Sequence, residues 1–461
     1  MLLPIDLDIF PRTKGVYIVG GSVRDLLCDR TPVDYDLAVQ DDPEMFARQL
    51  ASRAAGRVVE FGKTGHKILR VVGADFIFDI MPFNGKSIED DLRRRDFTFN
   101  AMALDLSSGR LIDPTDGRRD LAAHRIRMVS PEAFKTDPVR LIRAYRMAAA
   151  FEFSIDAVTE AAIARQADLV CKAAAERIRE EFFKILHTAG SHAQLAGMVR
   201  SGLLFSVFPE LQRLKKYRRP GNQARNYFEQ TLAAYSHLEI FFNSKRPVSV
   251  NGGSRFFTAN DAARTVLIKW AVLFHKIGKP QSQKVAANGT LNYYGHAAKS
   301  AALARQICQR LRFSGRQVDH IGFIIRRHCR PFSLFQQKQK GEIIDREFIR
   351  FCMKCTDAVP DILLLGLAEF FGNPRGGDPA AADFTAFIMA RIRQYETVLQ
   401  PRAQLPPAIN GNDLIQHFRL KPSADFRYIL KRIEEEHLAG RDLTRSQALG
   451  LVQNLLNRLR R

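Results

Sequence analysis

The chain has 461 residues and a formal net charge of +21, with 70 Lys and Arg against 49 Asp and Glu. This length exceeds what a single hydrophobic core organises and predicts about three or four domains. So large a positive charge favours a polyanionic partner, of which nucleic acid is the most common, over a surface charged only for solubility.

Three absences narrow the class of protein further. No apolar run reaches the length of a membrane span, and the first residues lack the basic segment and apolar core of a signal peptide. Six cysteines are too few for a disulfide framework in a chain of this length. We therefore expect a cytoplasmic protein with no membrane contact and no obligate protein partner.

A glycine pair follows the first expected strand, Val16–Val19. Gly20 and Gly21 let the backbone approach a phosphate group closely, and the amide groups of a helix starting there would face anionic oxygens. Arg24 adds a positive charge at the same place. Alone this is an ordinary turn, but with the carboxylates that follow it predicts a phosphate-binding turn.

Asp34 and Asp36 lie two residues apart on the next expected strand, so both side chains project from one face. Asp79 lies on a third strand-like run and can join them at one edge of the sheet. Carboxylate oxygens suit Mg²⁺, and three carboxylates can bind two Mg²⁺ ions while one accepts a proton from an attacking hydroxyl. We predict that Asp34 and Asp36 are metal ligands and that Asp79 is catalytic, with a structural ion pair of Asp79 as the alternative.

Polar residues suited to a nucleotide come next in the chain. Arg95 suits triphosphate oxygens, and Asp96 and Asn100 suit ribose hydroxyls. In isolation these residues would be a basic turn before a helix. The segment therefore predicts contacts to the sugar and the phosphates.

Asp137, Arg140, Arg143 and Arg146 recur every third residue on a helix expected over Asp137–Phe151, which places them on one broad face. A carboxylate accepts a hydrogen bond from an exocyclic amine, while a guanidinium donates to a ring acceptor. An Asp–Arg pair can therefore read the Watson–Crick edge of a base without a template. The alternative is a solvated basic helix face.

Strand and helix signals alternate over residues 1 to 127, and strand signals nearly vanish from residue 137 onward. The expected strands are Val16–Val19, Asp34–Val39, Arg57–Phe61, Lys67–Val72 and Phe76–Met81. The expected helices include Pro43–Ala55, Asp137–Phe151, Ala157–Val170 and Ala175–His187. This order predicts an α+β head with one sheet, followed by a helical remainder.

Taken together, these segments resemble the class II tRNA nucleotidyltransferases, the family of CCA-adding enzymes and bacterial poly(A) polymerases. The resemblance covers most of the chain and rests on motifs in the family's order: Gly20–Asp25 with Asp34 and Asp36, Arg94–Ala101, Asp137–Arg140, Glu176–Glu180, and the tail segments Asn410–Leu414 and Leu443–Leu449. It implies a polymerase-β-like head with one mixed sheet, then an all-helical neck, body and tail. The implied domains are a catalytic head (1–127), a neck and body (128–220), an HD-like domain (221–335) and a tRNA-binding tail (336–461).

The resemblance also implies a function. Such an enzyme adds C and/or A residues to tRNA 3′ ends without a template, using CTP and ATP and releasing pyrophosphate, with two Mg²⁺ ions. The residues that it assigns to nucleotide binding are Gly20, Gly21, Arg24, Arg95, Asp96, Asn100, Asp137, Arg140, Arg143 and Arg146. The connection from Met81 to Asp90 is short, as in CC-adding relatives, and Thr136 stands where the family often has Glu.

Three alternatives remain open. A poly(A) polymerase would carry a long basic extension in place of the CCA-type tail, and an RNA-binding protein with an inactive head would not need the carboxylates. An HD phosphohydrolase is suggested by Leu273–Pro280, which resembles the His-Asp core of that fold. Lys276 and Gln230, however, occupy the positions of a ligating Asp and the first His, and an ammonium repels a divalent cation. We therefore expect an HD-like domain without a catalytic metal.

Two basic clusters are candidate RNA contacts, because phosphate contacts position RNA without reading its sequence. Their residues are Arg213, Lys215, Lys216, Arg218 and Arg219 in the first, and Arg326, Arg327 and Arg330 in the second.

Overall fold

The structure is a computed structural model of the chain. It describes residues 7–63, 66–83, 85–218, 225–243, 262–285, 291–373, 379–440 and 443–459, so Arg219 of the first basic cluster and Asn84 of the short connection lie outside it. The chain forms two compact units, Met1–Val207 and Phe208–Arg461. The finer division into four domains remains a prediction.

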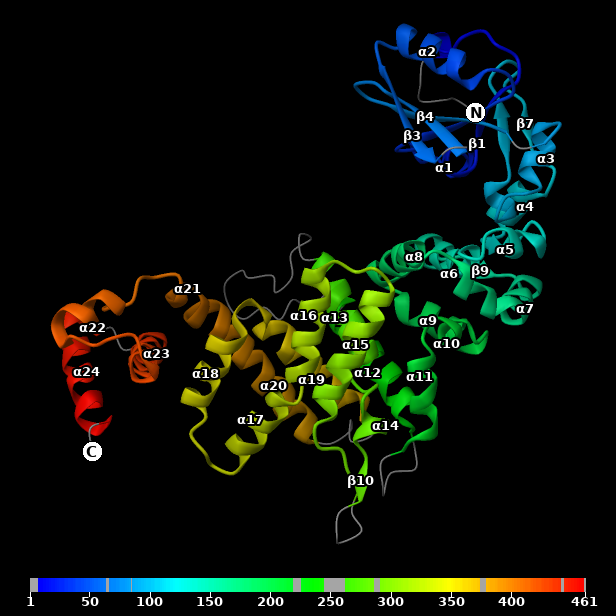
Figure 1. The fold of residues 1–461 in the computed structure, drawn as a ribbon. Helices are drawn as coiled ribbons and strands as arrows, with labels where there is room; N and C mark the ends of the chain where they lie inside the picture. Colours follow the sequence, from blue (N-terminus) through cyan, green and yellow to red (C-terminus); the bar gives the residue numbers. More distant parts are fainter. Residues whose placement is uncertain are drawn as a thin grey trace. The chain divides into compact units, whose positions relative to one another are not determined.

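A mixed sheet forms the centre of the first unit (Figure 1). Within the described part of the chain it has seven strands in the order β3-β4-β5-β2-β1-β6-β7, and all neighbours are antiparallel except β2 and β5. The strands are β1 (Val16–Val19), β2 (Tyr35–Val39), β3 (Arg57–Lys63), β4 (His66–Val72), β5 (Ile77–Pro82), β6 (Ala103–Asp105) and β7 (Leu111–Ile112). The five expected strands are thus confirmed, and β6 and β7 extend the sheet beyond β1. Two short strands, β8 (Arg125–Ile126) and β9 (Ser154–Ile155), pair separately.

Ten α-helices complete the described part of the first unit. They are α1 (Gly21–Leu27), α2 (Pro43–Arg53), α3 (Ile88–Leu92), α4 (Gly117–Ala122), α5 (Glu132–Thr136), α6 (Arg140–Phe151), α7 (Ala157–Gln166), α8 (Ala175–His187), α9 (Ser191–Arg200) and α10 (Leu203–Val207). Helix α2 packs against β3, β4 and β5. It begins where Pro43 fixes the first backbone angle and the Asp42 carboxylate accepts a hydrogen bond from the Met45 amide at 2.9 Å.

The expected helix over Asp137–Phe151 begins later than the spacing predicts. Helix α6 starts at Arg140, and Asp137 has extended backbone angles of φ −141° and ψ 91°. The cause is Pro138, since a proline ring disfavours helical geometry in the residue before it. The prediction that all four residues share one helix is therefore wrong for Asp137. The expected helix Ala157–Val170 also changes character, because α7 ends at Gln166 and continues as a 3-10 helix over Ala167–Lys172.

The second unit is helical apart from one short hairpin, β10 (Lys284–Val285) and β11 (Leu291–Asn292), in its described part. Its α-helices are α11 (Pro209–Arg213), α12 (Tyr227–Asn243), α13 (Ala262–Phe274), α14 (Lys279–Ser282), α15 (His296–Arg310), α16 (Gly315–Arg327), α17 (Arg330–Gln339), α18 (Asp345–Cys355), α19 (Val359–Gly372), α20 (Pro379–Gln394), α21 (Gln400–Ala403), α22 (Gly411–Phe418), α23 (Ala424–Leu438) and α24 (Arg445–Leu459). Helix α19 is apolar and nearly all buried, and it packs against α12 and α20.

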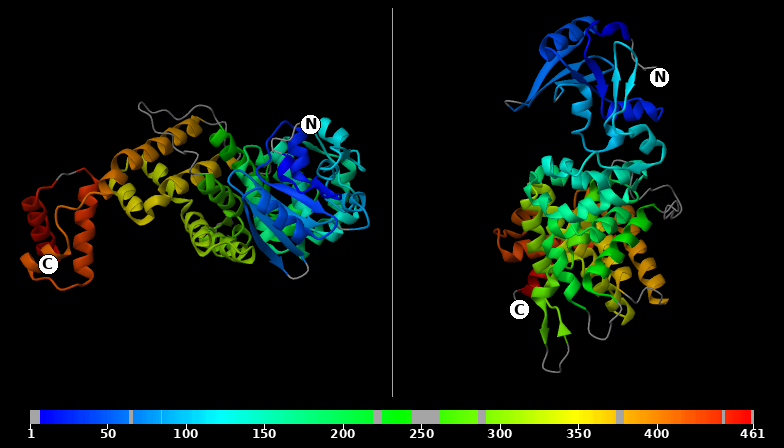
Figure 2. Two further views of the ribbon diagram at one scale, coloured as in Figure 1. Left: turned by 90° about the horizontal axis from the view of Figure 1, so that it is seen from above. Right: turned by 90° about the vertical axis from the view of Figure 1, so that its right-hand side faces the viewer.

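The last three helices form a small core of their own, seen at the red end of the chain in Figure 2. Its centre contains Leu414 of α22, Ile429 and Ile433 of α23, and Val452 of α24. This agrees with the expectation that the tail is all-helical. Among the described helices, none combines the length and apolarity needed to cross a bilayer.

Candidate active site

The turn between β1 and α1 forms one wall of the candidate site. Gly20 has a backbone φ of 71°, an angle that residues with a side chain rarely adopt. A Cβ atom at Gly20 would lie 2.9 Å from Nη1 of Arg95 and 3.4 Å from a carboxylate oxygen of Asp36. The guanidinium and the carboxylate therefore converge on the glycine backbone, and the positive φ favours glycine at this position.

Two of the predicted carboxylates lie side by side on the sheet. Asp36 of β2 is opposite Val19 of β1 and in register with Asp79 of the parallel strand β5, so the two aspartates share a face. Burial raises the pKa of Asp36 to about 6, Asp34 and Asp79 add to the rise, and Arg95 opposes it. Asp36 is thus a carboxylate whose charge is incompletely compensated.

Asp34 is exposed and lies just before β2. Ser22 of α1 fixes this corner of the site. Its hydroxyl donates to the Asp34 carbonyl at 3.3 Å and accepts from the Asp36 amide at 3.0 Å. The first expected carboxylate pair and the glycine turn are therefore joined by a direct contact.

Asp79 is 8% exposed and forms a two-pronged ion pair with Arg70 of β4. The guanidinium Nε lies 2.7 Å from one carboxylate oxygen and Nη2 lies 2.6 Å from the other. Arg70 and Asp79 are opposite one another in the antiparallel ladder. Both oxygens of Asp79 therefore already accept one strong hydrogen bond.

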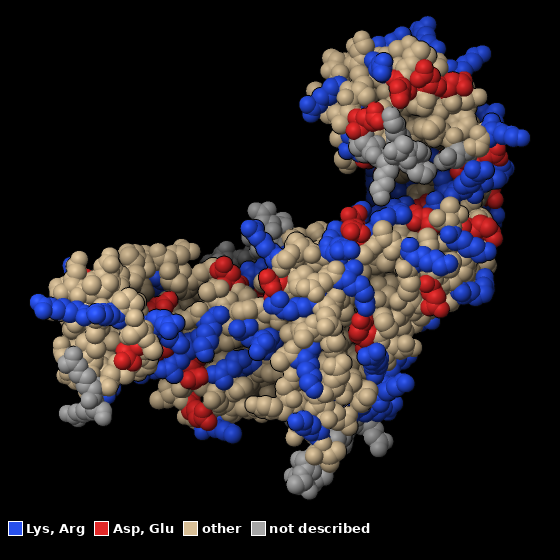
Figure 3. Space-filling view, in the orientation of Figure 1, with Lys and Arg blue, Asp and Glu red and all other residues tan. Residues whose placement is uncertain are grey.

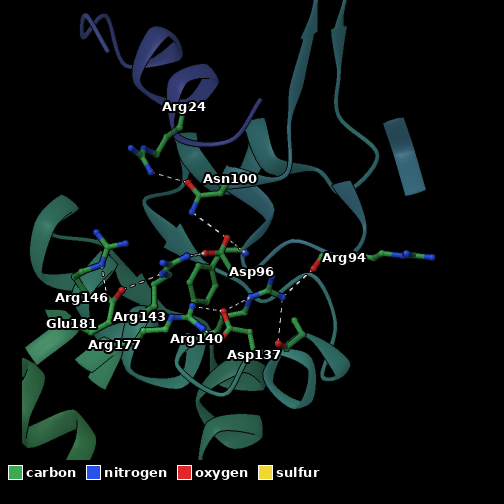
Figure 4. A network of polar contacts seen from close by, with 12 residues as sticks. Arg24, Arg94, Asp96, Asn100, Asp137, Arg140, Arg143, Arg146, Arg177 and Glu181 are labelled. Atoms are coloured by element: carbon green, nitrogen blue, oxygen red, sulfur yellow. Dashed lines mark hydrogen bonds and ion pairs between the residues drawn. The ribbon is translucent and has the colours of Figure 1, made fainter. Parts of the chain in front are cut away.

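A chain of hydrogen bonds leads from the turn to the neighbouring helices (Figure 4). Nη1 of Arg24 donates to Asn100 at 2.8 Å, and the Asn100 amide donates to Asp96 at 3.2 Å. The Arg24 guanidinium also lies 4.4 Å from the centre of the Phe151 ring. Asp25 accepts from Nε of Arg24 at 2.8 Å, so this guanidinium is held in a fixed position.

The chain continues through buried acids to helix α6. Asp96 is 6% exposed, and its second oxygen lies 3.3 Å from Nη1 of Arg143. Glu181 of α8 accepts from Arg143 at 3.3 Å and lies 2.6 Å from Nε of Arg146. Burial raises the pKa of Asp96, but Arg143 and the Phe97 amide outweigh burial and leave that pKa below its usual value. Asp96 therefore stays ionised between Asn100 on one side and Arg143 on the other.

The predicted base-reading pair lies at the start of α6 (Figure 4). Nε of Arg140 lies 3.8 Å from Asp137, and its Nη1 donates to the Arg94 carbonyl at 3.0 Å. Arg177 of α8 donates to both oxygens of Asp137, at 2.9 and 2.7 Å. Asp137 is therefore oriented by a second guanidinium that comes from a separate helix.

Known proteins give a consistent comparison. Residues 16–127 match the Poly A polymerase head domain, and residues 152–215 match the family described as a probable RNA and SrmB-binding site of polymerase A. The chain is 33% identical over 311 residues to a Multifunctional CCA protein of Aromatoleum aromaticum, covering 64% of this chain and 70% of that protein. The chain belongs to the class II tRNA nucleotidyltransferase family.

Similarity to other family members extends over the whole chain. An A-adding tRNA nucleotidyltransferase of Deinococcus radiodurans is 29% identical over 450 residues, which are 96% of each protein. A CCA-adding enzyme solved with CTP aligns with a TM-score of 0.66 at 20% identity, covering 96% of this chain and 91% of that one. The second comparison supports the shared fold, including the head with its single mixed sheet.

The sequence analysis did not identify two charged residues that pair with predicted site residues, Arg70 with Asp79 and Glu181 with Arg143. Arg70 was not singled out, although an arginine on the strand before Asp79 is a detectable signal once the hairpin β4–β5 is expected. Glu181 was also missed, although it directly follows the motif Glu176–Glu180 and lies on the face of α8 that packs against α6. Both are charged residues whose importance depends on burial, which the sequence does not report directly.

Lys276 lies where the resemblance to HD domains predicts a metal-ligating acid. Its Nζ atom donates to Gln230 at 2.9 Å and lies 3.5 Å from the side-chain oxygen of Asn373. Lys276 and Gln230 are both fully buried. An ammonium bound to amide oxygens therefore occupies the position at which the HD resemblance would have a metal.

A basic groove of about 770 Å³ lies on the second unit, between α16–α18 and α23. Its basic lining residues are Arg326, Arg327, Arg330, Arg350, Lys354, Lys431 and Arg432. Glu347 and Glu435 also line the groove and pair with Arg330, Arg350 and Arg432, and Figure 3 shows Lys and Arg side chains on this unit interspersed with acidic ones. The second predicted basic cluster thus forms one side of a larger basic groove.

Proposed function

We propose that this chain adds C and/or A residues to the 3′ end of tRNA without a nucleic-acid template, using CTP and ATP and releasing pyrophosphate. One observation carries the proposal: Arg24 of the glycine turn is linked by hydrogen bonds through Asn100 and Asp96 to Arg143 of α6, the helix at whose start Asp137 and Arg140 lie. Groups suited to phosphate transfer and groups suited to reading a base are thus joined in one site.

The nucleotide would bind along this line of residues. Gly20 and Gly21 allow its phosphates to approach the backbone, and Arg24 and Arg95 supply guanidinium donors to phosphate oxygens. Asp96 and Asn100 are close enough to share the sugar hydroxyls. Because these side chains already contact one another, little reorganisation would be needed when the substrate binds.

The donor set of Asp34 and Asp36 fits Mg²⁺, which prefers hard carboxylate oxygens. The incompletely compensated charge of Asp36 supports this assignment. When bound, two Mg²⁺ ions would activate the attacking hydroxyl and stabilise the oxygens of the α-phosphate. Asp79, in register with Asp36, would bind or activate the terminal hydroxyl of the tRNA through the oxygen lone pairs that Arg70 leaves available.

Base selection would come from Asp137 and Arg140. The Asp137 carboxylate would accept from the amine of cytosine or adenine, while Arg140 would donate to the neighbouring ring acceptor. Arg143 and Arg146 would support the pair through Glu181. UTP and GTP present a carbonyl where the amine would be, so they would face a carboxylate without a hydrogen-bond donor.

The RNA itself would contact the basic groove of the second unit, where phosphates can bind without sequence readout. The chain would act in the cytoplasm. A poly(A) polymerase is the second candidate, and the small tail core built by α22–α24 favours the CCA-adding type, whose tail the sequence resembles.

The test is one set of incubations of the full chain with Mg²⁺, each labelled nucleotide separately, and tRNA transcripts ending at the discriminator base, at the first C or at the second C. We expect transfer of CMP to the first two transcripts. From the short connection after Asp79 we also expect weak or absent transfer of AMP to the third. Absence of transfer to every transcript, or long A tracts on unrelated RNA, would refute the proposal. Efficient AMP addition after the second C would refute only the CC-adding refinement.

A further inference from the structure

Three histidines of the second unit share an unusual arrangement. Nδ1 of His275, His296 and His328 lies 2.6, 3.0 and 2.6 Å from the carbonyl oxygen of the residue three positions earlier. Each Nδ1 therefore carries a proton and donates it, which directs the lone-pair position Nε2 away from the backbone. Backbone carbonyls orient metal-binding imidazoles in this way.

The three rings lie against one another. The ring centres of His275 and His296 are 5.3 and 5.4 Å from that of His328, respectively. Cys329 adds its Sγ atom, 3.4 Å from Nε2 of His328 and 3.7 Å from Nε2 of His296. All three ligand atoms of His296, His328 and Cys329 lie within 4.8 Å of one another.

These separations match a tetrahedral site. Zinc–nitrogen bonds of about 2.0–2.1 Å and zinc–sulfur bonds of about 2.3 Å place nitrogen and sulfur about 3.6 Å apart at a tetrahedral angle. The observed distances of 3.4 and 3.7 Å bracket that value. Fully buried His275 adds an independent observation, since its Nε2 has no hydrogen-bond partner among the described residues.

We propose that His296, His328 and Cys329 bind a transition-metal ion of the Zn²⁺ class, with a fourth position left for water, His275 or Glu369. Thiolate and imidazole are soft to intermediate ligands, which favour Zn²⁺ or Co²⁺ over Mg²⁺. The site lies beside the position occupied by Lys276, which directly follows His275 in the chain. A metal bound there would overturn the expectation, drawn from Lys276 and Gln230, of an HD-like domain without a catalytic metal only if that metal also supported catalysis.

A metal ion bound at this site would be surrounded by both positive and negative side chains. Lys276 and the Lys279 ammonium are positive, while Glu369 lies 3.2 Å from Nε2 of His328 and 3.8 Å from Nζ of Lys279. Binding would release the Nε2 proton of His328 and the thiol proton of Cys329 to solvent. The two anions then left, a thiolate and the Glu369 carboxylate, offset the charge of a divalent ion.

The test uses Co²⁺ alone as the probe, added to the full chain after treatment with a chelator. We expect one thiolate-bound Co²⁺ per chain, measured by a thiolate-to-cobalt absorption band in the near ultraviolet that saturates at one equivalent. Cys329→Ser should lose the band, and His296→Gln should bind Co²⁺ at least tenfold more weakly. Cys171→Ser, which removes another exposed free cysteine, is the matched control and should change neither.

Cobalt bound at the oxygen ligands Asp34 and Asp36 would give no thiolate band, so the absorption separates the two sites. Metal analysis of the protein as purified provides a second readout, with zinc expected in the parent chain and reduced in both site variants. A band that persists in Cys329→Ser, or no band at all in the parent chain, would overturn the proposal. Circular dichroism of each variant shows whether a loss of binding reflects a loss of folding.

Discussion

At the scale of single residues, the candidate site depends on carboxylates that are close together and differently compensated. Asp36 is half-buried beside Asp34 and Asp79, whereas Asp79 is neutralised by Arg70. The Asp36 and Asp79 carboxylates lie on the same face of the sheet, but only Asp79 is paired with Arg70. Substitutions should therefore have graded rather than equal effects.

The first prediction concerns the proposed metal ligands. Asp34→Ala or Asp36→Ala should lower kcat by several orders of magnitude, because each removes a ligand at the reacting phosphate. Folding and tRNA binding should be retained, as measured by circular dichroism and a filter-binding assay. Asp75→Ala is the control, since Asp75 is exposed and precedes β5 without reaching the site. Near-normal turnover by either variant would contradict the assignment.

The second prediction concerns the pair Arg70–Asp79. Asp79→Ala should have a kcat between those of Asp36→Ala and the parent chain. Arg70→Met should also lower kcat, because it leaves a buried carboxylate without its two donors. In a double-mutant cycle the two losses should not add, since the residues act as one unit. Fully additive losses would mean that Arg70 acts independently of Asp79.

At the scale of helices and strands, the base-reading pair depends on how α6 begins. Pro138 ends the preceding turn and places Asp137 outside the helix, where Arg177 of α8 orients it. The three-residue spacing still predicts the arginines on α6, because helix periodicity holds from Arg140 onward. Only the residue before the proline departs from that spacing.

The third prediction is that Asp137→Ala relaxes the discrimination against UTP and GTP rather than abolishing transfer. Each lost or unfavourable polar contact corresponds to roughly 1–3 kcal/mol, or about ten- to a hundredfold in selectivity. Competition assays with pairs of nucleotides measure this ratio. Arg177→Met should change it in the same direction but less, and Thr136→Ala, an exposed neighbour, should leave it unchanged. An equal fall for all four nucleotides would contradict base reading by Asp137.

The fourth prediction concerns a buried ion pair between α12 and α13. Nζ of Lys269 lies 2.8 Å from Glu239, and the residues are 3% and 5% exposed. Lys269→Met leaves a buried carboxylate without its cation and should lower the free energy of unfolding by about 3–5 kcal/mol. The chain has one Trp, Trp270, which is fully buried on α13, so its fluorescence reports the unfolding of this unit. The double variant Lys269→Met/Glu239→Gln should recover much of the loss.

How much the sequence predicts differs between elements. The five expected strands are confirmed because alternating apolar residues and flanking turns define them locally. β6 and β7 were not expected, since three- and two-residue strands carry too little pattern and depend on pairing with β1. The role of Arg70 follows from its pairing with Asp79 across the hairpin β4–β5. The role of Glu181 follows from its burial against Arg143 and Arg146 of a separate helix, which no local pattern encodes.

At the scale of the whole molecule, part of the positive net charge of +21 can be assigned to one surface. Seven Lys and Arg residues line one groove of the second unit, while the candidate catalytic residues all belong to the first unit. The excess charge predicted a polyanionic partner, but it did not predict which basic residues gather. That depends on how α16, α17, α18 and α23 pack together.

The fifth prediction is that Lys354→Glu/Lys431→Glu weakens tRNA binding similarly for different tRNA sequences. Each lost phosphate contact should reduce the slope of log affinity against log salt by about one. At saturating tRNA, kcat should stay near that of the parent chain, because both lysines lie in the second unit. Arg48→Glu on α2 reverses one charge in the same way, which is half the change of the double variant, and serves as the control. An unchanged salt slope would exclude the groove as the tRNA-binding surface.

The confinement of the candidate catalytic and base-reading residues to Met1–Val207 has a consequence for how such enzymes can diversify. A preference for one nucleotide could change through substitutions in the first unit while the second unit keeps its hold on the same RNA. Conversely, a chimera that keeps the first unit of this chain and takes the second unit of a relative should bind a different set of RNAs. Its order of preference among nucleotides should be unchanged. Under the proposed assignments, nucleotide preference and RNA binding could change independently of each other, although a single chain encodes both.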